Sequence, residues 1–255
     1  MVQNDKFKRS YLITGSSHRI GRSLALNLAK EAEKVIIHYN KSQKEAENLA
    51  REIEQLGTEA FTIAADLSSP SEAEELIGRV WELVCPVDVL INNASIYETS
   101  HLKDVTVNDL QQNMMINAFA PLLLSRAFAE FNAQRNTKLR PVIINMLDAR
   151  ISYHDREHTA YQLSKQSLLW LTKIMALEFA PGVRVNGIAP GLILPPAGKD
   201  MSYLEHLKSK DPLNSIGTLD QIVQAAKFLI ENEYVTGQVI FVDGGKHLRG
   251  NLPSG

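Results

Sequence analysis

Cysteine is nearly absent from this 255-residue sequence, which has only Cys85. A single cysteine excludes an internal disulfide and a cysteine metal cluster, and it fits a reducing compartment. Net charge is also small, because 27 Lys and Arg oppose 29 Asp and Glu for a formal balance of -2. Such a chain has no overall field to attract nucleic acid or an anionic membrane, so an anionic ligand must be met by locally placed groups.

Long apolar runs are missing as well. The chain starts with the polar stretch MVQNDKFKRS, without the apolar region of a signal peptide, and no later run has the length of a membrane span. These absences predict a cytoplasmic protein. The 44% hydrophobic and 22% charged residues are ordinary for a globular chain and exclude a largely disordered one.

Short apolar segments alternate with longer helical patterns from end to end. This alternation predicts an α/β fold, a doubly wound parallel sheet with helices on both faces. The seven candidate strands are 11–14, 34–39, 60–65, 87–94, 141–146, 183–189 and 238–243, and the helical patterns include 20–32, 43–56, 71–84, 106–131, 158–179 and 219–231. We expect one domain over 1–255, with the glycine- and proline-rich stretch at about 190–215 as a mobile flap over a substrate.

A glycine turn between the first strand and the first helix is typical of a nucleotide-binding loop. Gly15 and Gly21 bracket this turn, where backbone N–H groups and the positive helix end can approach a pyrophosphate. A simple strand-to-helix turn that binds nothing is the alternative. The usual second glycine of such loops is replaced by Arg19.

The end of the second strand indicates which dinucleotide is bound. A carboxylate there would bind the free ribose hydroxyls of NAD, whereas this chain has Asn40, Lys41 and Ser42, which favour NADP(H). Lys41 as a solvated cation at the start of the next helix is the alternative. Asp66 ends the third strand, where it could accept a hydrogen bond from the adenine amino group or cap the helix that follows.

Tyr161 and Lys165 lie four residues apart, so they share one face of a predicted helix. We expect the ammonium of Lys165 to lower the pKa of the Tyr161 phenol from about 10 toward neutrality, which makes the tyrosine a usable proton donor. The pair alone is weak evidence. Its value comes from combination with the glycine turn, with INNAS at 91–95, with NAFAP at 117–121 and with YVTGQVIFVDGG at 234–245.

Together these segments resemble the short-chain dehydrogenase/reductase family over nearly the whole chain. The resemblance implies a Rossmann-type fold, often a homotetramer. It also implies that Lys165 holds the nicotinamide ribose, that Asn117 supports a water in a proton relay, and that Asn93 and Ala94 pack along the cofactor.

One departure from the family pattern concerns the substrate. Most members have a serine 13 residues before the tyrosine, and this chain has Asp148. A carboxylate repels a developing alkoxide but stabilises ring nitrogens that must be protonated, so Asp148 favours a nitrogen heterocycle over a ketone. Capping of the loop after the fifth strand is the alternative role for Asp148.

Three departures together are similar to the pteridine reductases, namely Arg19, Asp148 and the segment NNASIY, which places Tyr97 two residues after Ser95. In those enzymes the matching arginine touches cofactor phosphate and pterin, the serine approaches the cofactor, and an aromatic ring stacks the pterin against the nicotinamide. The ending DGGKHLRG and the segment IAPGLIL are similar to bacterial dihydromonapterin and dihydrofolate reductases. For Tyr97, an ordinary aromatic residue at a pocket rim is the alternative.

The predicted site follows from these arguments. We expect catalysis by Asn117, Asp148, Tyr161 and Lys165. We expect substrate contacts from Arg19, Ser95, Tyr97, Asp148 and Tyr161, and no metal. The predicted NADP(H) contacts are Gly15, Ser17, Arg19, Ile20, Gly21, Asn40, Lys41, Ser42, Asp66, Leu67, Asn93, Ala94, Ser95, Tyr161, Lys165, Pro190 and Gly191.

The stretch HDREH, from His154 to His158, has the H-x-x-E-H spacing of some zinc peptidases. A solvated loop explains it better, because it lies in a polar stretch with no further ligand helix evident. Three functions remain open. The first is an NADPH-dependent reductase of pterins or dihydrofolate, the second a carbonyl reductase acting for example on 3-oxoacyl thioesters, and the third a non-catalytic NADP(H)-binding regulator.

Overall fold

The computed structural model describes residues 8–196 and 198–249, with the side chain of Lys210 excepted. Its centre is one parallel sheet in the order β3-β2-β1-β4-β5-β6-β7. The strands are β1 (Arg9–Ile13), β2 (Ala32–Tyr39), β3 (Glu59–Ala64), β4 (Val89–Asn92), β5 (Val142–Met146), β6 (Arg184–Pro190) and β7 (Val239–Val242). All seven predicted strands are present within two residues of their expected bounds, which confirms the doubly wound, Rossmann-type α/β fold.

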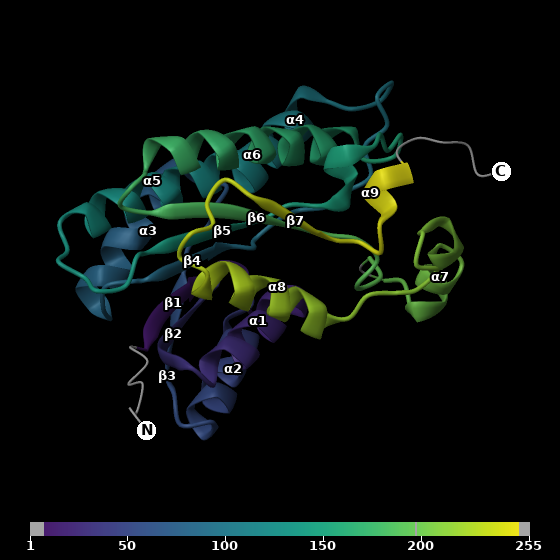
Figure 1. Cartoon of the computed structure of the whole chain (residues 1–255). Coiled ribbons are helices and arrows are strands. Elements are labelled where there is room, and N and C mark those ends of the chain that lie inside the picture. The colour runs from purple at the N-terminus through teal and green to yellow at the C-terminus, as the bar shows by residue number, and fades with distance from the viewer. Residues whose placement is uncertain (1–7, 197, 250–255) are drawn as a thin grey trace.

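Helices cover both faces of this sheet (Figure 1). One layer holds α1 (Arg19–Ala29), α2 (Gln43–Gln55) and α8 (Leu219–Glu231), and the other holds α3 (Pro70–Leu83), α4 (Val107–Met114), α5 (Ala120–Ala133) and α6 (Thr159–Glu178). The short helices α7 (Met201–Glu205) and α9 (Lys246–Arg249) lie beyond the sheet, near one another at the same end of the molecule. Within the described part of the chain, no helix is both long and apolar enough to cross a membrane.

The core explains why the strands were easy to predict. Alternate residues of a strand point to opposite faces, so Ile13 packs into the layer of α1 and α8 while Leu12 packs into the layer of α3 and α5. Both side chains are fully buried. Strands covered on both faces read as continuous runs of branched apolar residues, and β2 and β5 have this pattern.

Three expectations need correction. The helix predicted at 106–131 is α4, a π turn at Met115–Phe119, and then α5; the apolar pattern continues through the wide turn and hides it. The helix predicted to end at 32 ends at Ala29, because Ala32 already begins β2. Pro190, expected to open the flap, is the last residue of β6, and the flap contains α7.

Some expectations fall on residues outside the described ones. The polar start at 1–7, Ala197 in the flap, and the last residue of DGGKHLRG belong to this group. The single domain over 1–255 also stays a prediction.

The strand order reverses between β1 and β4, so the connections after these neighbouring strands leave toward opposite faces of the sheet. Such a switch point opens a crevice at the carboxyl ends of the strands, where open α/β folds bind their ligands. The loops after β1, β4, β5 and β6 all reach this crevice and form the candidate site.

Candidate active site

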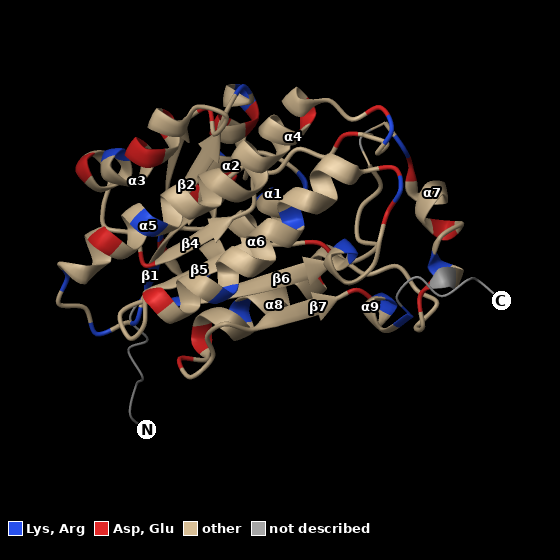
Figure 2. Ribbon diagram, turned by 90° about the horizontal axis from the view of Figure 1, so that it is seen from above, with Lys and Arg blue, Asp and Glu red and all other residues tan. Residues whose placement is uncertain are grey.

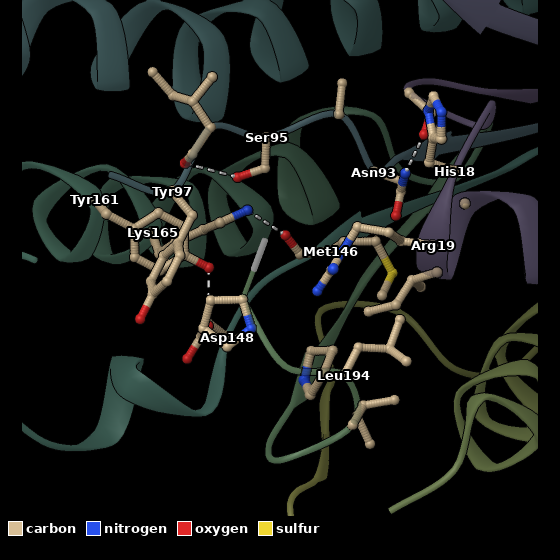
Figure 3. Close-up of a pocket in the computed structure, with 18 of the residues that line it drawn as sticks. His18, Arg19, Asn93, Ser95, Tyr97, Met146, Asp148, Tyr161, Lys165 and Leu194 are labelled. Atoms are coloured by element: carbon tan, nitrogen blue, oxygen red, sulfur yellow. Dashed lines mark hydrogen bonds between the residues drawn. The ribbon is translucent and has the colours of Figure 1, made fainter. Parts of the chain in front are cut away.

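A cavity of about 510 Å³ occupies this crevice. Figure 3 shows two groups of side chains in it, with His18, Arg19 and Asn93 toward one end and Ser95, Tyr97, Asp148, Tyr161 and Lys165 toward the other. We call the first the phosphate end and the second the substrate end. The predicted residues that line the cavity are Gly15, Arg19, Ile20, Gly21, Asn40, Asp66, Leu67, Asn93, Ala94, Ser95, Tyr97, Asp148, Tyr161, Lys165, Pro190 and Gly191.

Four predicted residues do not line the cavity. Ser17 and Asn117 are buried behind its wall, Lys41 is exposed beside it, and Ser42 precedes α2. Sequence reasoning missed other lining residues, above all His18, His38, Arg150 and the apolar residues after β6.

The glycine turn is shaped for close approach of a phosphate. Gly15 has φ +61°, and a Cβ on it would lie 2.9 Å from Cα of Ala94. A Cβ on Gly21 would lie 2.6 Å from the Gly15 carbonyl oxygen, so this glycine allows α1 to pack against the turn. His18 precedes α1 without a side-chain cap, which leaves the first-turn N–H groups available beside the cavity. These features fit a pyrophosphate.

His38 supports this turn and was not predicted. Its Nδ1 accepts a hydrogen bond from the Gly15 N–H at 3.0 Å, and its Nε2 lies 3.0 Å from the Ala65 carbonyl oxygen, to which it must donate. This pairing requires the neutral ring. Burial lowers the pKa of His38 to about 4, which agrees with the pairing. The one sequence feature that could have indicated this role is the position of His38, a polar residue inside the apolar strand β2.

Asn93 joins the turn to β4. Its amide Nδ2 donates to the carbonyl oxygens of Thr14 at 2.8 Å and Gly15 at 3.1 Å. Ala94 lies against Gly15 at the same point. The predicted location of both residues along the cofactor cleft is therefore consistent with the structure, and their contacts with a cofactor stay a prediction.

Asp66 closes the phosphate end below β3. It accepts hydrogen bonds from the backbone N–H and hydroxyl of Ser68 and from Asn40 Nδ2 at 3.1 Å, and the bonds to Ser68 lower its pKa. Ser69, and not Asp66, caps α3, because its hydroxyl accepts from the Glu72 N–H. The helix-cap alternative for Asp66 is thus wrong.

Arg19 opens α1 in the left-handed region, with φ +55°. That conformation costs a non-glycine residue on the order of 1–2 kcal/mol. Its guanidinium Nη2 donates to the Pro195 carbonyl oxygen at 2.7 Å, so the arginine links the phosphate loop to the segment after β6. The expected contacts of Arg19 with pyrophosphate and pterin stay predictions.

At the substrate end, the Tyr161 hydroxyl donates to Asp148 Oδ2 at 2.9 Å. Asp148 Oδ1 also accepts from the Arg150 N–H at 2.8 Å, so the loop-capping role and the contact with tyrosine coexist. Lys165 is buried and its ammonium donates to the Met146 carbonyl oxygen at 2.8 Å (Figure 3).

The pKa of Tyr161 moves opposite to the expected direction. Burial and the negative charge of Asp148 raise it well above 10, and Lys165 does not offset them, since its Nζ lies 5.6 Å from the tyrosine ring and bonds elsewhere. Burial lowers the pKa of Lys165 itself to about 8. The predicted lowering of the Tyr161 pKa is therefore wrong.

Asn117 lies in the π turn, fully buried. Its Oδ1 accepts from the Ser95 hydroxyl at 3.0 Å and the Ile96 N–H at 2.9 Å, while its Nδ2 donates to Ser164 Oγ at 3.0 Å. Asn117 therefore fixes the loop that carries Ser95 and Tyr97 onto α6. Its support of a relay water stays a prediction.

Tyr97 is half-buried between two rings. It stacks on His158 with centroids 4.2 Å apart and meets Tyr161 edge-on at 4.8 Å, and burial raises its pKa to about 12. The interpretation of 154–158 as a solvated loop is thus partly wrong, because His158 is buried and stacks on Tyr97, which lines the cavity. Asp155, Glu157 and His158 have potential ligand atoms within 4.8 Å of one another, a cluster that does not include His154.

The segment after β6 forms an apolar roof. Leu192, Ile193, Leu194 and Pro196 line the cavity, and α7 adds Leu204 with Tyr203 beside it. The position fits the predicted flap, whose motion stays a prediction.

Comparison with known proteins identifies the class. A family model described as Enoyl-(Acyl carrier protein) reductase matches residues 15–247. The chain belongs to the short-chain dehydrogenase/reductase family, and it is an oxidoreductase of that family.

Particular relatives differ in the substrates that their names give. The 3-oxoacyl-(acyl-carrier-protein) reductase FabG of Staphylococcus epidermidis is 31% identical, covering 94% of this chain and 99% of its own. Glucose 1-dehydrogenase 2 of Bacillus subtilis is 28% identical, with 97% and 98% covered. The structure of FolM alternative dihydrofolate reductase 1 from Brucella canis, complexed with NADP, has a TM-score of 0.87 at 29% identity, with 96% of both chains covered.

Proposed function

We propose that the protein is an NADPH-dependent reductase of dihydropterins or dihydrofolate, which reduces a ring C=N bond to the tetrahydro form. The observation that carries this proposal is the Asp148 carboxylate, which lines the cavity and accepts the hydroxyl hydrogen of Tyr161 at 2.9 Å. The family pattern that the sequence resembles has a neutral serine at this place.

NADP(H) is the cofactor that fits the residues present. The open N-terminus of α1 and the glycine turn suit the pyrophosphate, and Asn40 with the exposed Lys41 suits a 2′-phosphate. The NADP in the FolM complex and the NADPH in a blue fluorescent protein from a metagenomic library, which is 30% identical with a TM-score of 0.83, support the same choice. When bound, NADPH supplies the hydride.

Asp148 and Tyr161 would handle the accompanying proton. Because the Tyr161 hydrogen points to Asp148, the phenol oxygen presents lone pairs to a substrate. Lone pairs suit the N–H of a protonated ring nitrogen and leave a developing alkoxide without its usual donor. The ring nitrogen would take its proton before the hydride reaches the neighbouring carbon, and the Tyr161 oxygen and the Asp148 charge would stabilise that N–H. The ring of Tyr97 offers a flat surface for a stacked heterocycle.

Reduction of 3-oxoacyl thioesters is the second candidate. The 31% identity to the staphylococcal FabG reductase favours it. Tyr161 and Lys165, which the two reactions would share, do not separate them, so Asp148 is the residue that does.

The test is NADPH consumption by the purified protein, followed by absorbance, with dihydromonapterin, dihydrofolate and an acetoacetyl thioester in parallel. We expect turnover of the pterins and little of the thioester. Turnover of the thioester alone would show that Asp148 serves a carbonyl reductase. Binding of NADPH without any turnover would favour the regulator.

We also propose that the protein is a homotetramer. Leu163, Trp170, Ile174 and Leu177 of α6 are 49%, 62%, 40% and 76% exposed, an apolar stripe unusual for a free surface. The α6 ribbon in Figure 2 carries few charged positions compared with α3. Light scattering should give the tetramer mass, and Trp170→Glu should reduce it. A monomer mass for the unmodified protein would contradict the proposal.

A further inference from the structure

Arg150 lies between two carboxylates at the substrate end. Its Nε donates to Asp155 Oδ2 at 2.8 Å, and its Nη1 lies 3.4 Å from Oδ1 and 3.3 Å from Oδ2 of Asp148. The first contact has the length of a strong charge-assisted hydrogen bond, and the second is looser. Asp155 is therefore the anchor of the arginine, and Asp148 is the group on which it acts.

Asp155 is itself firmly held. Oδ2 of Asp155 pairs with His158 Nδ1 at 2.8 Å, Oδ1 accepts from the Glu157 N–H at 2.8 Å, and its backbone N–H donates to Gln162 Oε1. These bonds, together with Arg150, keep the pKa of Asp155 far below its usual range against the opposing effect of burial. The anchor is thus a fixed negative charge at neutral pH.

Arg150 also contacts the aromatic wall. Its guanidinium carbon lies 5.2 Å from the centroid of the Tyr97 ring, within range of a cation–π interaction. The ring stacks on His158, which bonds back to Asp155. Arg150, Asp155, His158 and Tyr97 therefore form a closed ring of contacts, which touches the Tyr161 and Asp148 pair through Arg150 and through Tyr97.

We propose that Arg150 is a positioning residue of the reductase, whose guanidinium, anchored on Asp155, holds the Asp148 carboxylate in the orientation that accepts the hydroxyl hydrogen of Tyr161. The inference concerns the same pocket as the proposed function and rests on it only for the choice of substrate. Arg150 acts through Asp148 and Tyr97 and transfers no proton itself.

Removal of the guanidinium has a definite consequence. Asp148 also interacts with Tyr97, Tyr153, Tyr161 and Lys165, of which only Lys165 carries a positive charge, and this ammonium bonds to the Met146 carbonyl. Without Arg150, the carboxylate loses its adjacent cation and the contact that orients it. An Asp148 carboxylate in another orientation no longer accepts from Tyr161 in the same way, so kcat should fall while substrate binding changes less.

The experiment compares Arg150→Met and Arg150→Lys with the unmodified protein. Arg156→Met is the matched control, because Arg156 is an exposed arginine of the same loop. We would measure kcat and KM for each substrate that the unmodified protein reduces. In parallel, we would record the NMR signal of the 13C-labelled Asp148 carboxyl at neutral pH, with its resonance assigned by its absence in Asp148→Asn.

We expect Arg150→Met to lower kcat roughly 10- to 100-fold with a smaller change in KM, and to change the NMR chemical shift of the Asp148 carboxyl. Arg150→Lys should recover part of both, and the NADPH Kd and the Arg156→Met protein should change less than about twofold. Asp155→Asn retains a bond to His158, so it should change kcat and the Asp148 carboxyl signal in the same way but less. It replaces Arg150→Met if the Arg150→Met protein does not fold.

An unchanged Asp148 carboxyl signal in Arg150→Met or Asp155→Asn would overturn the proposal, as would a loss of kcat that Arg150→Lys does not recover in part. The NMR measurement needs no turnover. The test of Arg150 is therefore separate from the test of the proposed function. The proposed function fails if the unmodified protein reduces only the thioester. In that case the Arg150 variants are measured with the thioester as substrate.

Discussion

The two ends of the cavity differ in the chemical groups that form them. At the phosphate end, the groups that shape the loop are backbone and neutral ones, namely the Gly15 turn, the open end of α1 and the uncharged ring of His38, and the charged Arg19 and Asp66 line the cavity around them. The substrate end is made of charges, with Asp148, Arg150 and Asp155 in contact and Lys165 buried beside them. Figure 3 shows Arg19 and Asn93 on one side of the cavity and Asp148 and Lys165 on the other.

This difference indicates which end of the cavity determines substrate specificity. Backbone N–H groups and a helix end recognise a pyrophosphate whatever the substrate is, so relatives with different substrates can share this end. Charges in a buried pocket select the charge that develops during the reaction. Under the proposed function, the features that the family shares lie at the phosphate end, and Asp148 with its neighbours selects the substrate.

Loss of the tyrosine hydroxyl should produce the largest effect, and only at the substrate end. Tyr161→Phe removes the group that donates to Asp148, so kcat should fall about 10²- to 10⁴-fold while the NADPH Kd stays within about twofold. Steady-state kinetics and fluorescence titration of NADPH measure the two quantities. Undiminished turnover would remove Tyr161 from the mechanism.

A crowded glycine should break the other end. In Gly21→Ala the new Cβ would meet Gly15 O at 2.6 Å and Asn93 Nδ2 at 2.5 Å, so α1 must shift away from the turn. We expect NADPH affinity to fall at least about tenfold and the free energy of unfolding to fall by about 1–3 kcal/mol. Gly57→Ala is a control at a site where the Cβ meets nothing within 4 Å, although its φ of +88° adds strain. Equal NADPH affinity in Gly21→Ala and the unmodified protein would contradict the role given to this turn.

The pH dependence of stability isolates His38. Its pKa is lowered from 6.5 to about 4 in the folded protein, so the unfolded chain takes up the proton first as the pH falls below 6.5. The contribution is present above pH 6.5 and is lost progressively toward pH 4. Between pH 7 and 4.5 the loss should be about 2–3 kcal/mol.

Urea unfolding at both pH values, compared with His38→Asn, separates this loss from the titration of carboxylates. The variant should lack about 2–3 kcal/mol of the pH dependence. The same dependence in both proteins would show that His38 is not held neutral.

A change at the outer edge of the phosphate end should have the smallest effect. Lys41 is exposed and does not line the cavity, so Lys41→Asp should change kcat little. The added negative charge should weaken NADPH binding about tenfold relative to NADH. An unchanged ratio of the two Kd values would mean that Lys41 is only a solvated cation at the start of α2.

The sequence predicts the scaffold well because the scaffold has periodic signals. Strands buried on both faces and amphipathic helices such as α8 follow directly from residue patterns. The π turn cannot be recognised from the sequence, because its residues continue the apolar pattern of a helix. The helix α7, only five residues long, has too little periodicity to stand out between prolines and glycines.

The sequence predicts a site residue only where that residue belongs to a motif with a fixed spacing. Tyr161, Lys165 and Asp148 meet as expected, but the direction of the Tyr161 pKa depends on burial and on Asp148, which spacing does not show. Arg150 and His158 lie in a polar stretch that resembles a solvated loop, and only the folded chain brings them to Tyr97. His38 is one polar residue in an apolar strand, where sequence alone does not distinguish a core histidine from one that supports the Gly15 turn.

The central claim is that Asp148 makes the substrate end selective for a protonated ring nitrogen. Its most direct test is the ratio of kcat/KM for dihydromonapterin to that for an acetoacetyl thioester, measured in the unmodified protein and in Asp148→Ser. We expect the ratio to be high in the first and to fall at least about 100-fold in the second, with pterin reduction lost and ketone reduction gained. The same ratio in both proteins would contradict the claim.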